Sequence, residues 1–379
     1  MSEHKPGIVW SNAIFFALTN LAAVTLVPWW GLTQGFGVSA WVAFGVLLAL
    51  GGMSITVGYH RLWAHRTFKA RAPLRLFLAI FGAMALQNSI YNWSARHRVH
   101  HRYVDDTGRD PHSARSGFWH AHMGWMLRNW PASEADYSRA KDLTKDAIVM
   151  WQHRHYWTLV WVTNLGLPLL LGLWAGDVIG MLLLAGVLRL VLSHHFTFFI
   201  NSLAHMWGRR PYSDENTAVD NGLVALVTWG EGYHNYHHAF PGDYRNGVRW
   251  WQYDPSKWFI SLCAWIGLVR DRRHTPEFRI HRARLHMQFR HLQQLAQSGR
   301  AHGQPGWVAA LERECQHFRD TVNQWQEVQG RQVQAGREAL NSRWARSELH
   351  ATLKELESRM KAQHRRLRAL AARAQPAVA

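Results

Sequence analysis

The chain has 379 residues, enough for one large domain and an appendage, with a formal net charge of +18 and a pI near 10.6. Such a charge is typical of proteins that bind nucleic acid or the anionic cytoplasmic face of a membrane, and the long apolar segments favour the membrane. Only two cysteines occur, Cys263 and Cys315, which excludes a disulfide framework and a cysteine-ligated iron–sulfur site.

Four apolar segments are predicted to cross a bilayer, which takes about 20 residues each. The first lacks a small-residue cleavage site, so we interpret it as a retained span rather than a signal peptide. Arg189 lies within the fourth, where a charge costs roughly 3 kcal/mol or more, and should pair inward or reach the interface. The predicted spans are residues 8–30, 38–58, 157–174 and 178–200.

A further apolar segment, residues 73–93, is not predicted to cross. The histidines before and after it can share one metal centre only if they face the same side of the membrane. An odd number of crossings between them is therefore forbidden. Gln87, Asn88 and Asn92 within the segment also suit a membrane surface better than lipid. We expect it to lie on the surface or over the histidines.

Histidines recur at fixed spacings beside these spans. The pattern H-x-x-H-H occurs at His97 and again at His234, the pair His60 and His65 precedes both, and His205 follows the fourth span. On a helix, positions i, i+3 and i+4 share one face. The donors exceed what one tetrahedral zinc needs, and neutral imidazole also suits iron, copper and nickel. Among 25 histidines a single pair carries little weight, but the repeated pattern predicts two metals.

The chemistry of such a set points to non-haem iron and O₂, because the histidine-rich stretches contain few carboxylates and no cysteine. Activated oxygen can take hydrogen from an unactivated C–H bond, a reaction beyond ordinary acid–base groups. We expect carboxylates to orient the rings. The candidates, each of which could instead be a solvated loop charge, are Asp105, Asp106, Asp110 and Glu231.

Residues 272–379 differ in character, with 20 Lys and Arg against 9 Asp and Glu. We divide the chain into a membrane domain, residues 1–271, and a basic helical extension, residues 272–379. Residues 303–306 are predicted to break the extension into two helical parts. An apolar stripe at helical spacing indicates a packing seam, with membrane or partner binding as the alternative. Its members are Leu349, Leu353, Leu356, Met360, Leu367 and Leu370.

Four motifs, HRLWAH (60–65), RHRVHH (96–101), NSLAH (201–205) and GEGYHNYHH (230–238), resemble those of the membrane acyl-CoA Δ9 desaturases, the stearoyl-CoA desaturases and their bacterial relatives. The resemblance covers roughly residues 8–271. It implies an all-α membrane protein with four transmembrane helices and a helical cytosolic cap that holds a di-iron centre.

The resemblance also implies the iron ligands. It assigns His60, His65, His101 and His237 to one iron and the other five to the second, with Asn201 holding a metal-bound water. The nine histidines are His60, His65, His97, His100, His101, His205, His234, His237 and His238. Seven others match no ligand position and are expected to be structural or interfacial: His112, His120, His122, His153, His155, His194 and His195.

Substrate positions follow from the same resemblance. Gln87, Trp93 and Thr197 match residues that line the bend of the family's acyl tunnel, although Phe198 stands where animal members carry Trp. The remaining implied contacts are Leu48 and Gly52 at the closed end of the tunnel, and Asn88 and Arg128 at the nucleotide end of CoA. The chain departs from animal members there, so a phospholipid or acyl carrier protein stays open as the acyl carrier.

The expected reaction inserts a cis double bond, at Δ9, with O₂ and two electrons. A separate ferredoxin-like donor or reductase is implied, because no His-Pro-Gly-Gly stretch of a fused cytochrome b5 occurs. Lys and Arg in the histidine-bearing loops predict an inner-membrane protein with the site and both termini in the cytoplasm. Two alternatives stay open: a membrane hydroxylase or alkane monooxygenase with the same motifs, and a non-enzymatic scaffold.

Overall fold

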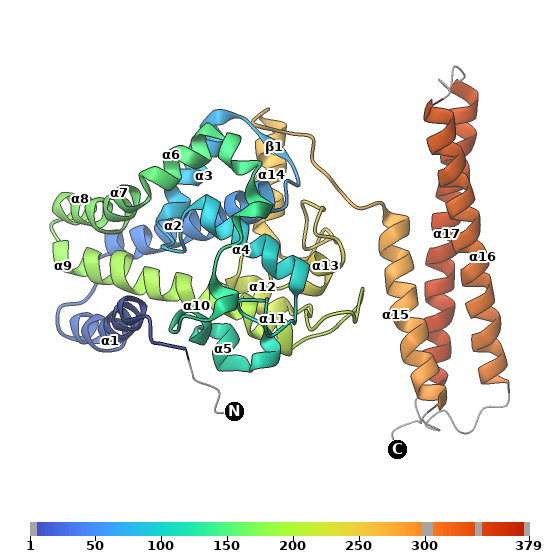
Figure 1. The fold of residues 1–379 in the computed structure, drawn as a ribbon, viewed down its shortest axis with the longest axis horizontal. Helices are drawn as coiled ribbons and strands as arrows, with labels where there is room; N and C mark the ends of the chain where they lie inside the picture. The colour runs from blue at the N-terminus through green and yellow to red at the C-terminus, as the bar shows by residue number, and fades with distance from the viewer. Residues whose placement is uncertain (1–5, 298–305, 338–342, 375–379) are drawn as a thin grey trace. The chain divides into compact units, whose positions relative to one another are not determined.

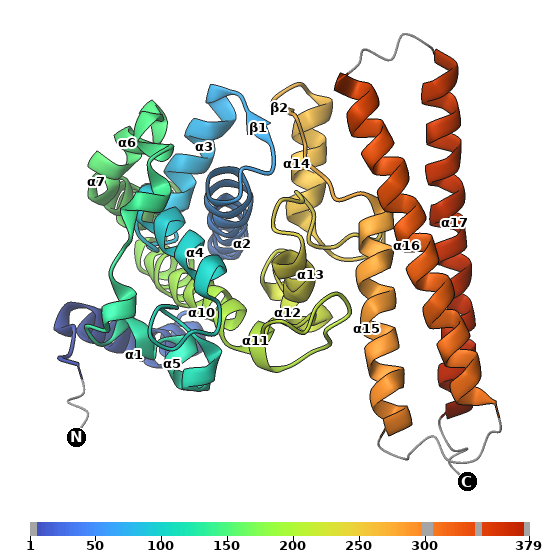
Figure 2. The same ribbon diagram turned by 45° about the vertical axis from the view of Figure 1, so that its right-hand side comes forward.

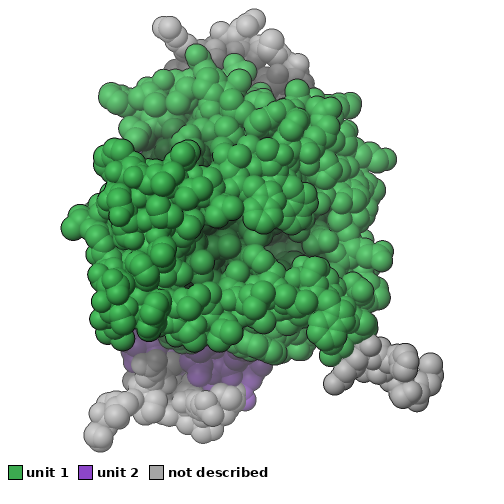
Figure 3. Space-filling model, turned by 90° about the vertical axis from the view of Figure 1, so that its left-hand side faces the viewer, with its two compact units in different colours: residues 1–209, 215–274 green, residues 210–214, 275–379 purple. Residues whose placement is uncertain are grey.

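The computed structural model describes residues 6–297, 306–337 and 343–374, with the side chains of 330–337, 343–350 and 374 left out. The chain divides into two compact units, coloured separately in Figure 3. Unit 1 is residues 1–209 with 215–274, and unit 2 is residues 210–214 with 275–379. The predicted domains, 1–271 and 272–379, stay a prediction, because compactness alone does not show independent folding.

Four helices in unit 1 are long and apolar enough to cross a membrane: Trp10–Thr33, Val38–Ala64, Tyr156–Ala175 and Val178–Met206. These agree with the four predicted spans, and the prediction of an all-α membrane fold is confirmed. Three of the four combine α-helical and π-helical segments. The segments are α1 (Trp10–Thr33); α2 (Val38–Met53) and η1 (Ser54–Ala64); α7 (Tyr156–Trp161), η7 (Val162–Gly166) and α8 (Leu167–Ala175); α9 (Val178–Met181), η8 (Leu182–Leu188), α10 (Arg189–Asn201) and α11 (Leu203–Met206).

The fifth apolar segment folds as α3 (Ala72–Ala83) and does not continue into α4 (Ile90–Tyr103). Twelve residues of helix extend about 18 Å, less than the roughly 30 Å of a bilayer core. Leu86 and Asn88 adopt left-handed backbone conformations, with φ of 50° and 76°, so the chain turns between the two helices. The expectation that this segment does not cross agrees with its length.

The remaining elements of unit 1 are short and lie around the ends of the spans (Figure 1). They comprise α5 (Phe118–His122), α6 (Ala147–Arg154), α12 (Gly222–Val227), α13 (His234–Ala239), α14 (Pro255–Trp265), the 3-10 turns η2 (Ala114–Ser116), η3 (Gly124–Met126), η4 (Pro131–Ser133), η5 (Tyr137–Ala140) and η6 (Leu143–Lys145), and the strands β1 (Lys69–Ala70) and β2 (Val269–Arg270). The two strands pair antiparallel, with Lys69 opposite Arg270.

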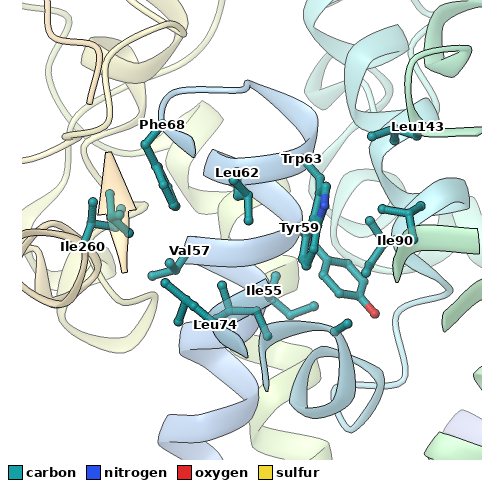
Figure 4. Packing of buried hydrophobic residues seen from close by; sticks show 14 of the residues in the cluster. Ile55, Val57, Tyr59, Leu62, Trp63, Phe68, Leu74, Ile90, Leu143 and Ile260 are labelled. Atoms are coloured by element: carbon teal, nitrogen blue, oxygen red, sulfur yellow. The ribbon is translucent and has the colours of Figure 1, made fainter. Parts of the chain in front are cut away.

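The core of unit 1 surrounds η1, every residue of which is buried. Tyr59 and Trp63 pack toward Ile90 and Leu143 on one side, while Val57 lies toward Ile260 of α14 on the other (Figure 4). The buried hydroxyl of Tyr59 accepts a hydrogen bond from Gln152 Nε2 at 2.7 Å. The C-terminal end of the second span is therefore held on both sides, and it carries His60 in a fixed position.

Of the two predicted alternatives for Arg189, the structure shows inward pairing. The Arg189 side chain is 1% exposed and donates to the carbonyls of Ala185, at 3.1 Å, and Met84, at 3.0 Å. It also donates to Oδ1 of Asn164 in the third span, at 2.7 Å. One guanidinium thus ties the third and fourth spans to the end of α3.

Replacing Arg189 by methionine is expected to lower the free energy of unfolding by about 3 kcal/mol, because the acceptors it leaves are buried. Arg154→Met, at an exposed position before the third span, is the matched control and should change stability by less than about 0.5 kcal/mol. Thermal unfolding in detergent measures both. Equal effects of the two substitutions would contradict the inward pairing.

Unit 2 contains three long helices: α15 (Glu277–Gln297), α16 (Trp307–Arg337) and α17 (Arg343–Ala374). The prediction of two helical parts was wrong, because the described residues form three separate helices. Of the predicted stripe, Leu356, Met360 and Leu367 are buried and Leu353 and Leu370 pack against them. Residues 303–305 and the side chain of Leu349 lie outside the described residues. The stripe is a packing seam among these helices.

Candidate metal centre

The nine predicted histidines form two groups around α4 and α13. Within each group the potential ligand atoms lie within 4.8 Å of one another. Both helices contribute to both groups, since α4 carries His97, His100 and His101, and α13 carries His234, His237 and His238. The first group is His60, His65, His97, His101 and His237, and the second is His100, His205, His234 and His238.

The first group depends on the π-helical form of η1. The amide of His65 bonds to the carbonyl of His60, five residues back, at 3.0 Å. On a regular α-helix residues five apart point in different directions, whereas a π-turn brings them together. The two rings lie 4.8 Å apart, and Nε2 of His65 is 2.8 Å from Nε2 of His97. His237 Nε2 lies 3.0 Å from His60 Nε2 and 2.9 Å from His101 Nε2.

The second group centres on His234, whose Nε2 lies 3.1 Å from Nε2 of both His205 and His238. His100 completes it, with its Nε2 3.4 Å from that of His238. His100 comes from α4, His205 from the end of the fourth span, and His234 and His238 from α13. Asn201, the predicted holder of a metal-bound water, is the last residue of α10, four residues before His205.

The structure corrects the division of ligands implied by the family resemblance. His97 was assigned to the second iron, but its ring lies with His60, His65 and His101. The physical reason is the helical spacing. His97 and His101 are one turn apart on α4 and face the same way, while His100 lies to the side and turns toward His238.

On two of the histidine rings a carboxylate lies beside the nitrogen that faces away from the group, and this determines which ring nitrogen can bind a metal. Nδ1 of His60 lies 2.9 Å from Glu231, and Nδ1 of His100 lies 2.9 Å from Asp110. Since a carboxylate only accepts, a neutral ring bound this way carries its proton on Nδ1 and presents a lone pair at Nε2. Convergent lone pairs repel unless a cation lies between them, so the donor set fits bound metal.

His205 is oriented by a relay through a hydroxyl. Thr217 donates from Oγ1 to Asp105 at 2.5 Å, so its oxygen accepts from Nδ1 of His205 at 2.8 Å. Asp105, Asp110 and Glu231 thus act as predicted, two directly and one through Thr217. Asp106 instead pairs with Arg109 at the surface and is a solvated charge.

Burial keeps the rings outside the spans neutral. It lowers the pKa of His65, His97 and His101 well below 6.5, and neighbouring rings lower it further. The same causes hold for His234, His237 and His238. Neutral imidazole is the form that binds metal. Burial raises the pKa of Glu231, but its interactions with His60 and with the charged Arg61 outweigh burial and lower the pKa to about 2.

A buried ionic network behind the first group was missed by the sequence analysis. Arg61 donates to Glu231 Oε1 from Nε at 3.2 Å and Nη2 at 2.9 Å, and its Nη2 also lies 3.0 Å from Asp254. Asn246 donates to the other oxygen of Glu231 at 2.6 Å. The only sequence signal was an arginine within the HRLWAH motif. The network fixes Glu231, and through it the ring of His60.

The seven histidines that were expected to be structural or interfacial make separate contacts. His122 bonds Ser202 and His195, each at 3.0 Å, and His194 bonds the carbonyl of Ala85 at 3.0 Å. His153, His120 and His155 bond Ser89, Pro111 and Trp151. His112 stands apart, because it could hold a metal together with His100 and Asp110, and its ring lies 4.4 Å from that of His100.

The predicted substrate residues fall into two sets. Trp93 stacks on His97 with ring centroids 4.7 Å apart, and Gln87 Nε2 donates to Thr197 Oγ1 at 2.8 Å. Asn88 and Arg128 instead make contacts within the protein. The backbone N–H of Asn88 donates to the Tyr156 hydroxyl, and the Arg128 guanidinium donates to the backbone carbonyl of Pro6. Leu48 is half-buried in α2. The substrate roles of all these residues stay predictions.

Gly52 lies where Trp229 approaches α2, and a Cβ at Gly52 would overlap the indole. Gly52→Ala is therefore expected to destabilise the protein by about 1–3 kcal/mol. Gly45→Ala in the same helix, where the space is open, should be neutral or stabilising by about 0.5–1 kcal/mol. Thermal unfolding compares the two. If both substitutions stabilise, Trp229 does not occupy this position.

Comparison with known proteins agrees with the geometry. The fatty acid desaturase family model matches residues 39–260. A probable acyl-CoA desaturase of Schizosaccharomyces pombe is 48% identical over 233 residues, 61% of this chain and 48% of the relative. Acyl-CoA desaturase 1 of Saccharomyces cerevisiae is 48% identical over 224 residues, 59% and 44% of the two chains.

Stearoyl-CoA desaturase 5 of Bos taurus is 39% identical over 278 residues, 71% of this chain and 81% of the relative. The chain spans about half the length of the two yeast relatives and most of the mammalian one. The family match covers more than half of the chain and includes all nine clustered histidines, eight of them in the motifs at 60–65, 96–101 and 230–238, and His205 as the ninth. The chain belongs to the fatty acid desaturase family.

Proposed function

We propose that this protein is a membrane desaturase that inserts a cis double bond, at Δ9, into a saturated acyl-CoA with O₂ and two electrons. The observation that carries the proposal is the pair of histidine groups, to which the ends of the second and fourth of the four apolar spans contribute together with α4 and α13. The names of the relatives, acyl-CoA and stearoyl-CoA desaturases, support this substrate class.

The two groups would hold two iron ions, five imidazoles at one and four at the other. His97 belongs to the first, and Asn201 would add a water to the second. Two bound irons would supply the oxygen activation that breaks an unactivated C–H bond. The chain itself fixes the rings through Glu231, Asp110 and Thr217.

The acyl chain would pass between Trp93 and the Gln87–Thr197 pair. Oε1 of Gln87 is buried without a hydrogen-bond partner among the described residues, which is costly unless a bound molecule satisfies it. The Trp93 ring lies against the first histidine group, so a chain held there is beside the metal. Leu48 and Gly52 would close the far end, and Asn88 and Arg128 would face the nucleotide of CoA.

The electrons would come from a separate ferredoxin-like protein or reductase with an acidic surface, steered by the chain's positive charge. We place the protein in a bacterial inner membrane, with the histidine groups and both termini in the cytoplasm. The terminal residues 1–5 and 375–379 lie outside the described residues. Residues 1–271 would be the catalytic domain and 272–379 a helical extension of it.

Expression in cells that lack their own desaturase tests the proposal. The expected product is a fatty acid two hydrogens lighter, with its double bond at carbon 9, that requires O₂. A product heavier by one oxygen would show a hydroxylase instead. No product in membranes that contain folded, iron-loaded protein and a donor system would contradict the proposal. The variant lacking His237 is the negative control.

A further inference from the structure

The helix α14 has apolar residues on two faces, and only one of them is covered. Its inner face packs on η1 through Ile260 and Cys263. Its outer face carries a stripe at positions i, i+4, i+7 and i+8, which is the spacing of one helical face. The stripe consists of Trp258, 46% exposed, Leu262, 54%, Trp265, 83%, and Ile266, 54%. A contiguous apolar stripe of this kind marks an interaction surface.

The direction of α14 suits a membrane surface. It runs across the direction of α2 and α10 in both ribbon views (Figures 1 and 2). If the spans follow the membrane normal, α14 lies along the plane. Its C-terminal end is joined to the start of α3 through the β1–β2 pair and a bond from the Arg71 amide to the Leu268 carbonyl, at 2.9 Å. The start of the short apolar helix α3 and the C-terminal end of α14 are therefore joined by backbone hydrogen bonds.

A basic pocket of about 610 Å³ opens at the same end of α14. Ala264, which precedes Trp265 of the stripe, forms part of its wall, and Arg270, Arg272 and His274 supply positive or polar groups. Arg245 also lines it but is paired with Asp243 at 2.9 Å. Asp271 also lines it but is paired with Lys69 at 2.8 Å. Arg272 lies over the Tyr244 ring, 5.4 Å from its centroid. The pocket therefore favours an anion.

We propose that the outer stripe of α14 inserts into the membrane surface and that the adjacent pocket binds the phosphate headgroup of an anionic phospholipid. Tryptophan and aliphatic side chains beside arginines are the composition of membrane-surface helices. The four spans keep a bilayer next to unit 1 in any case. An acidic protein partner would account for the arginines of the pocket. It would not account for the four exposed apolar side chains on one face of α14, which a membrane surface does.

The depth of the stripe can be measured by spin labelling of the full chain in nanodiscs that contain phosphatidylglycerol. With Cys263 and Cys315 replaced, labels are placed by Trp265→Cys and, as the control, Arg273→Cys, an exposed site outside the pocket. We expect the label at 265 to collide several-fold more with O₂ and less with a water-soluble nickel chelate than the label at 273. Equal exposure to nickel, or shielding only after an acidic redox protein is added, would overturn the proposal.

The pocket is tested by binding of short-chain phosphatidylglycerol to detergent-purified protein. R270Q/R272Q should weaken the binding affinity about tenfold or more, since each arginine attracts an anionic headgroup and the variant removes two of them. R154Q/R273Q removes the same charge outside the pocket and should leave binding within about twofold of the wild type. Iron content and thermal unfolding confirm that the variants are folded. Equal loss in both variants would overturn the headgroup site, as would displacement of the lipid by equimolar inorganic phosphate or glycerol phosphate.

Discussion

Replacing His237 by alanine is expected to abolish desaturation and to reduce the bound iron from two ions per chain to one or none. Its Nε2 lies within 3.0 Å of both His60 and His101 Nε2, at the middle of the first group. Loss of a residue that only orients a ligand costs about 10–100-fold, so loss of the ligand should cost at least about a hundredfold. Product analysis and iron determination on purified protein measure the two effects.

His155→Ala is the matched control for this prediction. His155 is exposed and bonds only its own helix, at the carbonyl of Trp151, in the interactions seen here. It should keep wild-type activity and iron. His97→Ala then tests the corrected grouping. His97→Ala should remove iron from the first group, as His65→Ala should, so that the spectrum of the remaining ion is the same in both variants. Full activity of His237→Ala would refute its place in the centre.

Replacing Glu231 by glutamine is expected to destabilise the protein by about 3–5 kcal/mol, since it breaks a buried ionic network. Glu231 is 2% exposed and contacts Arg61, Asn246 and His60. A glutamine keeps the volume but removes the charge that balances Arg61, and its single acceptor oxygen cannot serve both Arg61 and His60 as the two carboxylate oxygens of Glu231 do. Iron affinity should fall about 10–100-fold at the first group.

The matched control for Glu231 is Asp106→Asn, which removes a carboxylate near the histidines that pairs with Arg109 and accepts from the Gly108 amide at the surface. Its effect on unfolding should stay below about 0.5 kcal/mol, with iron affinity unchanged. Thermal unfolding and competition with a chelator measure both variants. Similar behaviour of the two variants would mean that Glu231 orients nothing.

The parts of the structure that the sequence could predict depend on local pattern. The length of the apolar segments identified the four spans. The requirement for an even number of crossings between His65 and His97 predicted that residues 73–93 do not cross, in agreement with the short length of α3. The H-x-x-H-H spacing predicted that positions i, i+3 and i+4 share one face, which holds for His97 with His101 and for His234 with His238, whereas His100 and His237 each join the other group. The cost of a charge in lipid predicted that Arg189 would pair inward or reach the interface, and its bonds to Ala185, Met84 and Asn164 show the first of these.

The parts that could not be predicted depend on tertiary contacts. The π-helical form of η1, which brings His60 and His65 together, has no signal in residue spacing alone. Thr217 and Asp254 reach the site from loops distant in sequence, so nothing marked them. The separation of α16 and α17 into two helices was missed because apolar periodicity continues in both. His97 was misassigned because the resemblance was used without the geometry of α4.

The most direct test of the metal centre is an anomalous difference map recorded at the iron edge from crystals of the purified protein. We predict two peaks per chain, one among His60, His65, His97, His101 and His237, and one among His100, His205, His234 and His238. A single peak, or peaks away from these imidazoles, in crystals of active protein would contradict the account.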